Sequence, residues 1–156
     1  MKILAKNRRA KFDYHLKEFF EAGIVLTGQE TKSTKGGNIS LKGSYVTLHP
    51  VKGKPGYMEA FLLNAHISPY KHAGELPDYD PVRTRKLLLK KAEIRKLIGK
   101  KQAEGLTIVP TKVYTKRRKI KVEIALARGK KQYDKREGIK QRQDDRAAER
   151  ELRGKI

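Results

Sequence analysis

The clearest hydrophobic pattern lies near the end of the chain, where two apolar stretches flank a short basic turn. Residues 106–115 and 120–127 predict a β-hairpin, with residues 116–119 as its turn. In the second stretch Lys121 falls on the outward face, opposite the inward residues Ile120, Val122, Ile124 and Leu126. Pro110 lacks a backbone N–H, which predicts a bulge or an unpaired edge position in the first stretch.

Further strands are predicted in the first half of the chain, separated by glycine-rich and proline-rich turns. Apolar or alternating residues occupy residues 24–27, 45–49 and 57–67, and an irregular loop follows over residues 68–81. The basic arm of residues 1–11 can continue as a strand in its second half. About six short strands predict a mainly β fold, a small antiparallel barrel of the oligonucleotide-binding type with short flanking helices and a basic C-terminal tail.

Helical spacing predicts two helices. The first spans residues 14–22, with Asp13 as its cap and Gly23 as its end. Its buried face would hold Leu16, Phe19 and Phe20, and its exposed face Tyr14 and Glu21. The second helix spans residues 83–101, where Leu87, Ile94, Leu97 and Ile98 form an apolar stripe and Leu88 lies off it, about 100° from Leu87.

The composition changes at Gly129. Residues beyond it are mostly charged, and they offer only a thin apolar line for packing. Because an unpacked helix is marginal in water, we expect a tail that is disordered alone and helical when bound. The predicted organisation is a barrel over residues 1–131 and a basic tail over residues 132–156.

The charge balance indicates a polyanionic partner. The chain has 156 residues, 38 Lys and Arg against 17 Asp and Glu, and a formal net charge of +21. Such an excess is typical of proteins that bind nucleic acid, because each neutralised phosphate releases counterions. The chain has no cysteine, no apolar run long enough to span a membrane and no signal-peptide pattern. We therefore expect a cytosolic protein with no membrane partner.

Candidate chemistry is limited to RNA contacts. Tyr14 could stack on a base and Glu21 could accept hydrogen bonds from a base edge, although both also fit an ordinary exposed helix face. Leu88 could pack on a base or sugar, or be buried with its neighbours. The carboxylates Glu75, Asp78 and Asp80 are the only hint of a metal-dependent nuclease, and a solvated loop explains them better. No catalytic, metal or cofactor site is predicted.

Several local motifs together resemble the SsrA-binding protein (small protein B) family. The resemblance covers roughly residues 7–137, in order and with the family's spacing. Its motifs are Asn7-Arg8-Arg9-Ala10 with Tyr14, Phe20-Glu21-Ala22-Gly23-Ile24, Gly37-Asn38-Ile39-Ser40, His66-Ile67-Ser68-Pro69-Tyr70, Arg83-Thr84-Arg85-Lys86-Leu87-Leu88-Leu89, Gly105–Pro110, Val122–Lys131 and Tyr133-Asp134-Lys135-Arg136.

The resemblance implies a non-enzymatic barrel that grips the tRNA-like domain of transfer-messenger RNA. The positions that match the family's RNA-binding residues are Glu21, Leu88 and Lys121, with Tyr14 nearby. We add Asn7 and Arg9 of the basic arm to the predicted RNA-binding set.

The resemblance also implies a role for the tail. Tyr133, Asp134, Lys135 and Arg136 would enter the decoding centre and empty mRNA channel of a stalled bacterial 70S ribosome, where the tail folds as a helix. Elongation factor Tu would be a further partner in delivery, and the protein itself is expected to be a monomer. A generic RNA-binding or ribosomal barrel without specificity for transfer-messenger RNA remains the alternative.

Overall fold

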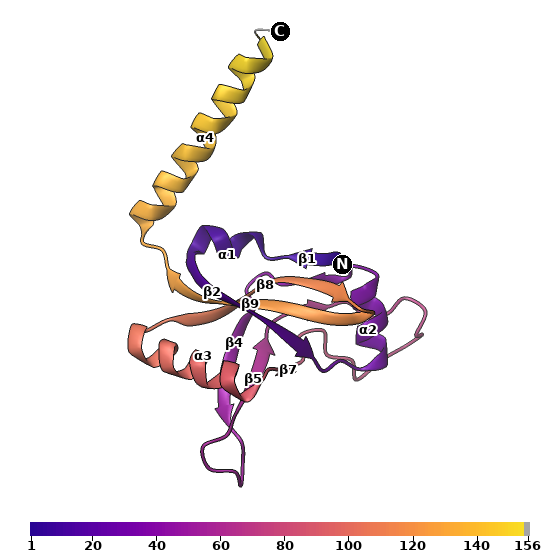
Figure 1. Ribbon diagram of the computed structural model, residues 1–156. Coiled ribbons are helices and arrows are strands. Elements are labelled where there is room, and N and C mark those ends of the chain that lie inside the picture. Colours follow the sequence, from indigo (N-terminus) through magenta and orange to yellow (C-terminus); the bar gives the residue numbers. More distant parts are fainter. Residues whose placement is uncertain (155–156) are drawn as a thin grey trace.

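Six antiparallel strands pair in a closed ring in the computed structural model (Figure 1). The pairing order is β8-β4-β5-β7-β2-β9, and β9 pairs back with β8, which confirms a mainly β fold of about six strands. The structure describes the backbone of residues 1–154 and the side chains of residues 1–131 and 135–150. The elements are β1 Lys2–Lys6, α1 Arg8–Asp13, β2 Tyr14–Ile24, α2 Gly28–Lys35, β3 Ile39–Ser40, β4 Tyr45–Pro50, β5 Met58–Leu63, β6 His66–Ile67, β7 Arg85–Leu88, α3 Lys91–Glu104, β8 Thr107–Lys116, β9 Lys119–Gly129 and α4 Gln132–Gly154.

The predicted C-terminal hairpin is confirmed as β8 and β9. Its register shifts between Pro110 and Lys112, which is the bulge expected from the missing N–H of the proline. The side chains of Val122, Ile124 and Leu126 are fully buried inside the ring. They form the core together with the inward residues Ala22, Val46, Ala60, Leu62, Leu87, Ile108 and Val113.

The helix predicted over residues 14–22 is wrong, because this segment is the long strand β2. It pairs with β9 from Tyr14 opposite Gly129 to Gly23 opposite Lys121. Phe20 is buried, whereas Phe19 is 52% exposed and not part of the core. Apolar residues at positions i, i+3 and i+4 suit one face of a helix, but here the strand partner decides the conformation.

The helix predicted over residues 83–101 is wrong in its first half. The segment first forms β7, which lies between β5 and β2, and only then the helix α3. Leu87 and Leu97 are both buried as predicted, but on different elements. The helix ends before Gly105, whose φ of 62° suits a residue without a side chain.

Two short helices lie where the pattern predicts none. In the basic arm the strand β1 comes first and α1 follows, the reverse of the expected strand in the second half. Residues 25–27 lie beyond the end of β2, and α2 then begins. A reciprocal capping box starts α2, since Thr27 Oγ1 accepts from the Glu30 N–H and the Glu30 carboxylate accepts from the Thr27 N–H.

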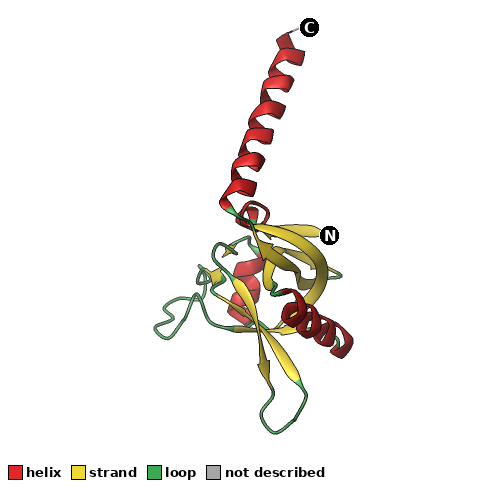
Figure 2. Cartoon of the chain, turned by 90° about the vertical axis from the view of Figure 1, so that its left-hand side faces the viewer, coloured by secondary structure: helices red, strands yellow, loops and turns green. Residues whose placement is uncertain are grey.

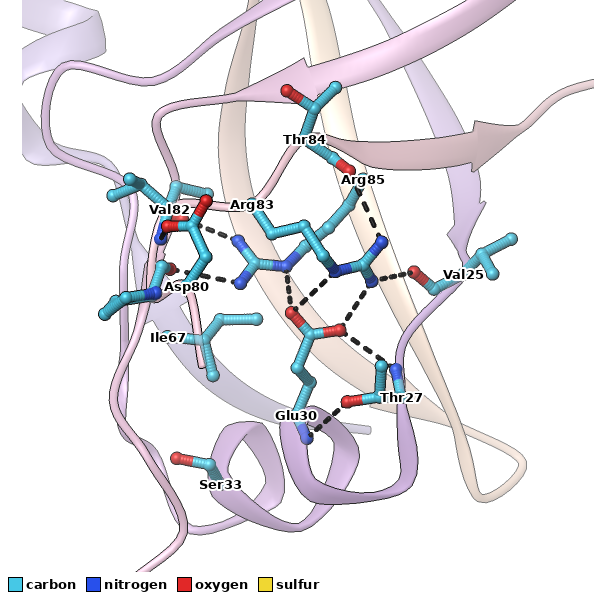
Figure 3. Close-up of polar contacts among 12 residues, drawn as sticks. Val25, Thr27, Glu30, Ser33, Ile67, Asp80, Val82, Arg83, Thr84 and Arg85 are labelled. Carbon is cyan, nitrogen blue, oxygen red and sulfur yellow. Dashed lines mark hydrogen bonds and ion pairs between the residues drawn. The ribbon is translucent and has the colours of Figure 1, made fainter. Parts of the chain in front are cut away.

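Glu30 of α2 is the acceptor at the centre of a buried ion network (Figure 3). Its carboxylate lies 2.6 Å from both Arg83 Nη2 and Arg85 Nε, and the Arg85 side chain is fully buried. Arg85 also donates to the carbonyls of Ala65 and Pro81 at 2.7 and 3.0 Å. Burial raises the pKa of Glu30, but the hydrogen bonds from Arg83, the Thr27 N–H and Arg85 outweigh it and lower that pKa to about 2.

The helix α4 projects away from the barrel (Figures 1 and 2). It follows β9 closely, and the Lys130 N–H donates to the Asp13 carbonyl at 2.8 Å, next to the start of the helix. Disorder of the tail before binding stays a prediction. None of the helices within residues 1–154 is long and apolar enough to cross a membrane.

Candidate RNA interface

Three neighbouring strands bring the predicted residues Leu88 and Lys121 to the two sides of Gly23. Gly23 of β2 pairs with Leu88 of β7 on one side and with Lys121 of β9 on the other. Leu88 is 52% exposed, which decides between the two alternatives left open by the sequence, and the reason is strand alternation beside the buried Leu87. We call the patch of the exposed Glu21 and Leu88 with the half-buried Gly23 and Lys121 the Leu88 surface.

Glu21 lies on the same face of β2 as Gly23, two residues away, and its carboxylate is held in place. The Tyr114 hydroxyl donates a hydrogen bond to it, and Lys116 Nζ lies 3.5 Å from it. The Tyr114 hydrogen bond lowers the pKa of Glu21, and the nearby charges of Lys116 and Lys121 act in the same direction. The Leu88 surface therefore presents a fixed, ionised acceptor between cations, which suits recognition of a base edge.

The predicted residues Tyr14, Asn7 and Arg9 form a second group, away from the Leu88 surface. Tyr14 and Glu21 would share one stripe of a helix, about 10 Å apart, but on β2 the same seven residues separate them by roughly 23 Å. Tyr14 packs against a small cluster with Ala10. Asn7 Nδ2 donates to the Pro110 carbonyl at 2.8 Å, so this side chain ties the arm to the bulge.

Arg9 is more available to a ligand than its neighbours in this second group. Its side chain is 64% exposed and pairs with Asp13 at 3.4 Å. Its guanidinium also lies 5.1 Å from the ring centroid of Phe12, a cation–π distance.

One predicted tail residue contacts the barrel domain. Lys135 Nζ lies 3.4 Å from Asp13 Oδ1 and 5.8 Å from the Phe12 ring centroid. Arg136 is exposed on α4. The side chains of Tyr133 and Asp134 lie outside the described residues. The structure therefore joins the tail to the second group and not to the Leu88 surface.

Many charged side chains outside these two groups are held by contacts within the chain. Of the nine cations in residues 83–101, five pair with carboxylates, namely Arg83, Arg85, Lys86, Lys96 and Lys100. Asp80 of the acidic loop accepts a hydrogen bond from the Val82 N–H at 3.0 Å. Within the described part of the chain, no three His, Cys, Asp or Glu side chains are grouped to hold a metal ion.

Sequence patterns do not identify three residues on the outer face of the sheet that carries the Leu88 surface. They are Gly23, Tyr114 and Phe19. Gly23 is predicted as a helix end, and Phe19 as a core residue. A strand assignment to residues 14–24 would have placed Phe19, Glu21 and Gly23 together on one face, because alternate residues of a strand share a side. Tyr114 could be found only with the hairpin register, which pairs it with Lys121.

Comparison with known proteins gives the chain a family. The SmpB protein family matches residues 4–154. The chain belongs to the SmpB protein family. It is 51% identical over 152 residues to the SsrA-binding protein of Acaryochloris marina, covering 97% of this chain and 94% of that protein. It is 49% identical over 156 residues to the SsrA-binding protein of Persephonella marina, covering 100% and 97%.

The fold of this chain is also similar to that of a chain in a solved structure. It is described as "tmRNA-SmpB: a journey to the center of the bacterial ribosome". One of its chains matches with a TM-score of 0.63 at 44% identity, over 82% of this chain and 85% of that chain. The antiparallel fold and the family assignment therefore agree.

We expect Gly23→Val to weaken RNA binding about tenfold, some 1.4 kcal/mol, without unfolding the barrel. A Cβ at this position would lie 3.3 Å from the Leu88 Cβ, so a branched side chain must displace Leu88. Valine is itself favourable in a strand. Filter binding with transfer-messenger RNA measures the effect. Gly28→Ala is the control, since a Cβ there meets nothing within 4 Å, and equal affinities for the two variants would contradict the prediction.

Proposed function

We propose that this chain binds transfer-messenger RNA and delivers it to stalled ribosomes for trans-translation. The observation that carries the proposal is the meeting of Glu21, Leu88 and Lys121 on one exposed face, from three different strands. Membership of the SmpB protein family and the names of the relatives support it. The net charge of +21 supports an RNA partner independently.

The Leu88 surface is proposed to hold the tRNA-like domain of the RNA. Leu88 offers an apolar contact for a base or sugar, Lys121 a cation for a phosphate, and Glu21 an acceptor for a base edge. The protein acts without catalysis or a cofactor in this proposal, so all bond making belongs to the ribosome.

The tail is proposed to act on the ribosome. Lys135 and Arg136 lie on the first turns of α4, at the point where the helix leaves the barrel. The proposal places α4 in the decoding centre and the empty mRNA channel, as a substitute for a codon–anticodon pairing. We further propose that elongation factor Tu takes part in delivery. The protein acts as a monomer in this proposal.

Removing residues 132–156 is expected to leave affinity for transfer-messenger RNA within about threefold and to abolish peptide tagging on stalled ribosomes. The Leu88 surface lies on strands that end before the tail, which is the physical reason for separate effects. Binding is measured on transfer-messenger RNA, bulk tRNA and duplex DNA at near-physiological salt, and tagging in a reconstituted translation system. The full chain should prefer transfer-messenger RNA by at least about tenfold, some 1.4 kcal/mol.

The same assay tests the alternative of a generic RNA-binding barrel, which the large positive charge also favours. Equal binding of all three nucleic acids with a steep salt dependence would support that alternative. If the truncated chain loses all RNA binding, the RNA-binding site lies in the tail. That result would contradict the proposed role of the Leu88 surface.

A further inference from the structure

A basic hairpin projects from the barrel at the end opposite α4 (Figures 1 and 2). It joins β4 and β5 through residues 51–57, which contain Lys52 and Lys54 but no acidic residue. The turn is ordered by backbone hydrogen bonds, including Val51 N–H to the Tyr57 carbonyl at 2.9 Å and Tyr57 N–H to the Lys54 carbonyl at 3.2 Å. The hairpin is therefore a defined projection that carries positive charge.

An aromatic ring lies where the hairpin meets α3. Tyr57 is 47% exposed, and Lys91 Nζ lies 4.8 Å from its ring centroid. A pocket of about 160 Å³ opens beside the ring, between the hairpin and the helix. Its walls include Met58, Ile94, Arg95 and Ile98, so apolar side chains and two cations surround an accessible aromatic.

The cations here are not neutralised by the chain itself. Of the acidic residues nearest in the sequence, Glu59 pairs with Lys86 at 3.2 Å and Glu93 accepts from the Lys90 N–H at 3.0 Å. Within the described residues, Lys52, Lys54 and Arg95 have no ion-pair partner. An exposed aromatic beside uncompensated cations is the combination that binds an RNA strand, with a base on the ring and phosphates on the cations.

This site is continuous with the Leu88 surface. Leu88 ends β7, and Lys91 begins α3 only three residues later. Ala60 of β5 pairs with Leu87 of β7, so β5, which begins at Met58 directly after Tyr57, lies beside the strand that carries Leu88. An RNA on the Leu88 surface therefore needs only a short extension past the end of β7 to reach Tyr57.

We propose that Tyr57, Lys52, Lys54, Lys91 and Arg95 form a second contact site for the same transfer-messenger RNA, in which an unstacked base packs on Tyr57. The inference rests on the proposed function of the Leu88 surface and adds a site beyond it. The hairpin acts as a finger that lengthens the RNA contact past the barrel.

Two variants test the site by binding. Tyr57→Ala is expected to weaken binding of transfer-messenger RNA about tenfold, the effect expected for one stacked base. The double variant Lys52→Gln, Lys54→Gln is expected to reduce the slope of log affinity against log salt by about one for each phosphate that is no longer neutralised. The matched controls are Tyr45→Ala, where the tyrosine is 40% exposed, and the exposed pair Lys35→Gln, Lys42→Gln. Affinity and salt slope equal to those of the controls would overturn the proposal.

A photocrosslink identifies the RNA. With Tyr57→p-benzoylphenylalanine in the full chain, a crosslink to transfer-messenger RNA in the binary complex is expected. A crosslink that forms only with ribosomal RNA in the assembled ribosome would overturn the proposed source. Failure of the wild-type chain to prefer transfer-messenger RNA over tRNA would instead contradict the proposed function, so the two failures are distinguishable.

Discussion

Replacing Leu88 with glutamate is expected to weaken binding of transfer-messenger RNA about a hundredfold, or about 2.7 kcal/mol, while the barrel stays folded. Leu88 is 52% exposed, so its side chain contributes little to the core. The new carboxylate would lie on the strand beside β2, near Glu21, and would face a polyanion. The substitution removes an apolar contact and adds repulsion at the same point.

Two further variants separate the kinds of contact on this surface. Leu88→Ala should weaken binding by about tenfold without changing the salt dependence, because it removes no charge. Lys121→Gln should instead reduce the slope of log affinity against log salt by about one, as expected when one phosphate is no longer neutralised.

Val82→Glu is the matched control for Leu88→Glu. It adds the same charge at a 46% exposed position on a loop. Equal weakening of binding by Val82→Glu and Leu88→Glu would indicate general repulsion and not a specific surface.

The Leu88 surface shows what the sequence can and cannot predict. The sequence leaves Leu88 either exposed or buried with its neighbours, and it places Leu88 off the apolar stripe of a helix that is not there. A position off a helical stripe and an outward position on a strand both lie outside the core, so this part of the prediction holds although the element is wrong. Lys121 is predicted correctly both as a strand residue and as an outward one, because apolar and charged residues alternate regularly from Lys119 to Ile124.

The errors have a common physical cause, which is that long-range pairing decides local structure. Residues 14–22 carry apolar spacing that suits a helix, but β9 supplies a partner along nearly the whole segment. Because the segment is a strand, Tyr14 lies far from Glu21 and Gly23 lies beside Leu88. No window of neighbouring residues contains this information.

The burial of Glu30 cannot be predicted from sequence patterns. It lies in the polar segment Gly28–Lys35, where a charged side chain normally faces water, and its two arginine partners are more than 50 residues away. Its burial depends on β7, which brings in Arg85, and on the loop that carries Arg83. Two of the three cations in residues 83–86, Arg83 and Arg85, therefore serve an internal ion network.

Replacing Glu30 with glutamine is expected to lower the free energy of unfolding at pH 7 by about 3–5 kcal/mol. The change leaves the fully buried guanidinium of Arg85 without a counter-charge, and it weakens the hydrogen bonds to both arginines. Glu59→Gln is the matched control, since its pair with Lys86 at 3.2 Å is partly exposed and should be worth less than about 1 kcal/mol. Urea denaturation of both variants and the wild type gives the comparison.

The pH dependence of this destabilisation is the sharper measurement. Glu30 has a folded pKa of about 2, below its ordinary value of 4.5, so its stabilisation is fully present above pH 4.5 and is lost as the pH falls toward 2. A shift of this size corresponds to about 3 kcal/mol. Glutamine cannot ionise, and a protonated Glu30 resembles it. The stability difference between wild type and Glu30→Gln should therefore be constant from pH 7 to pH 5 and shrink steadily below pH 4.5. A difference that stays constant down to pH 3 would show that packing, and not the buried charge, makes this network stabilising.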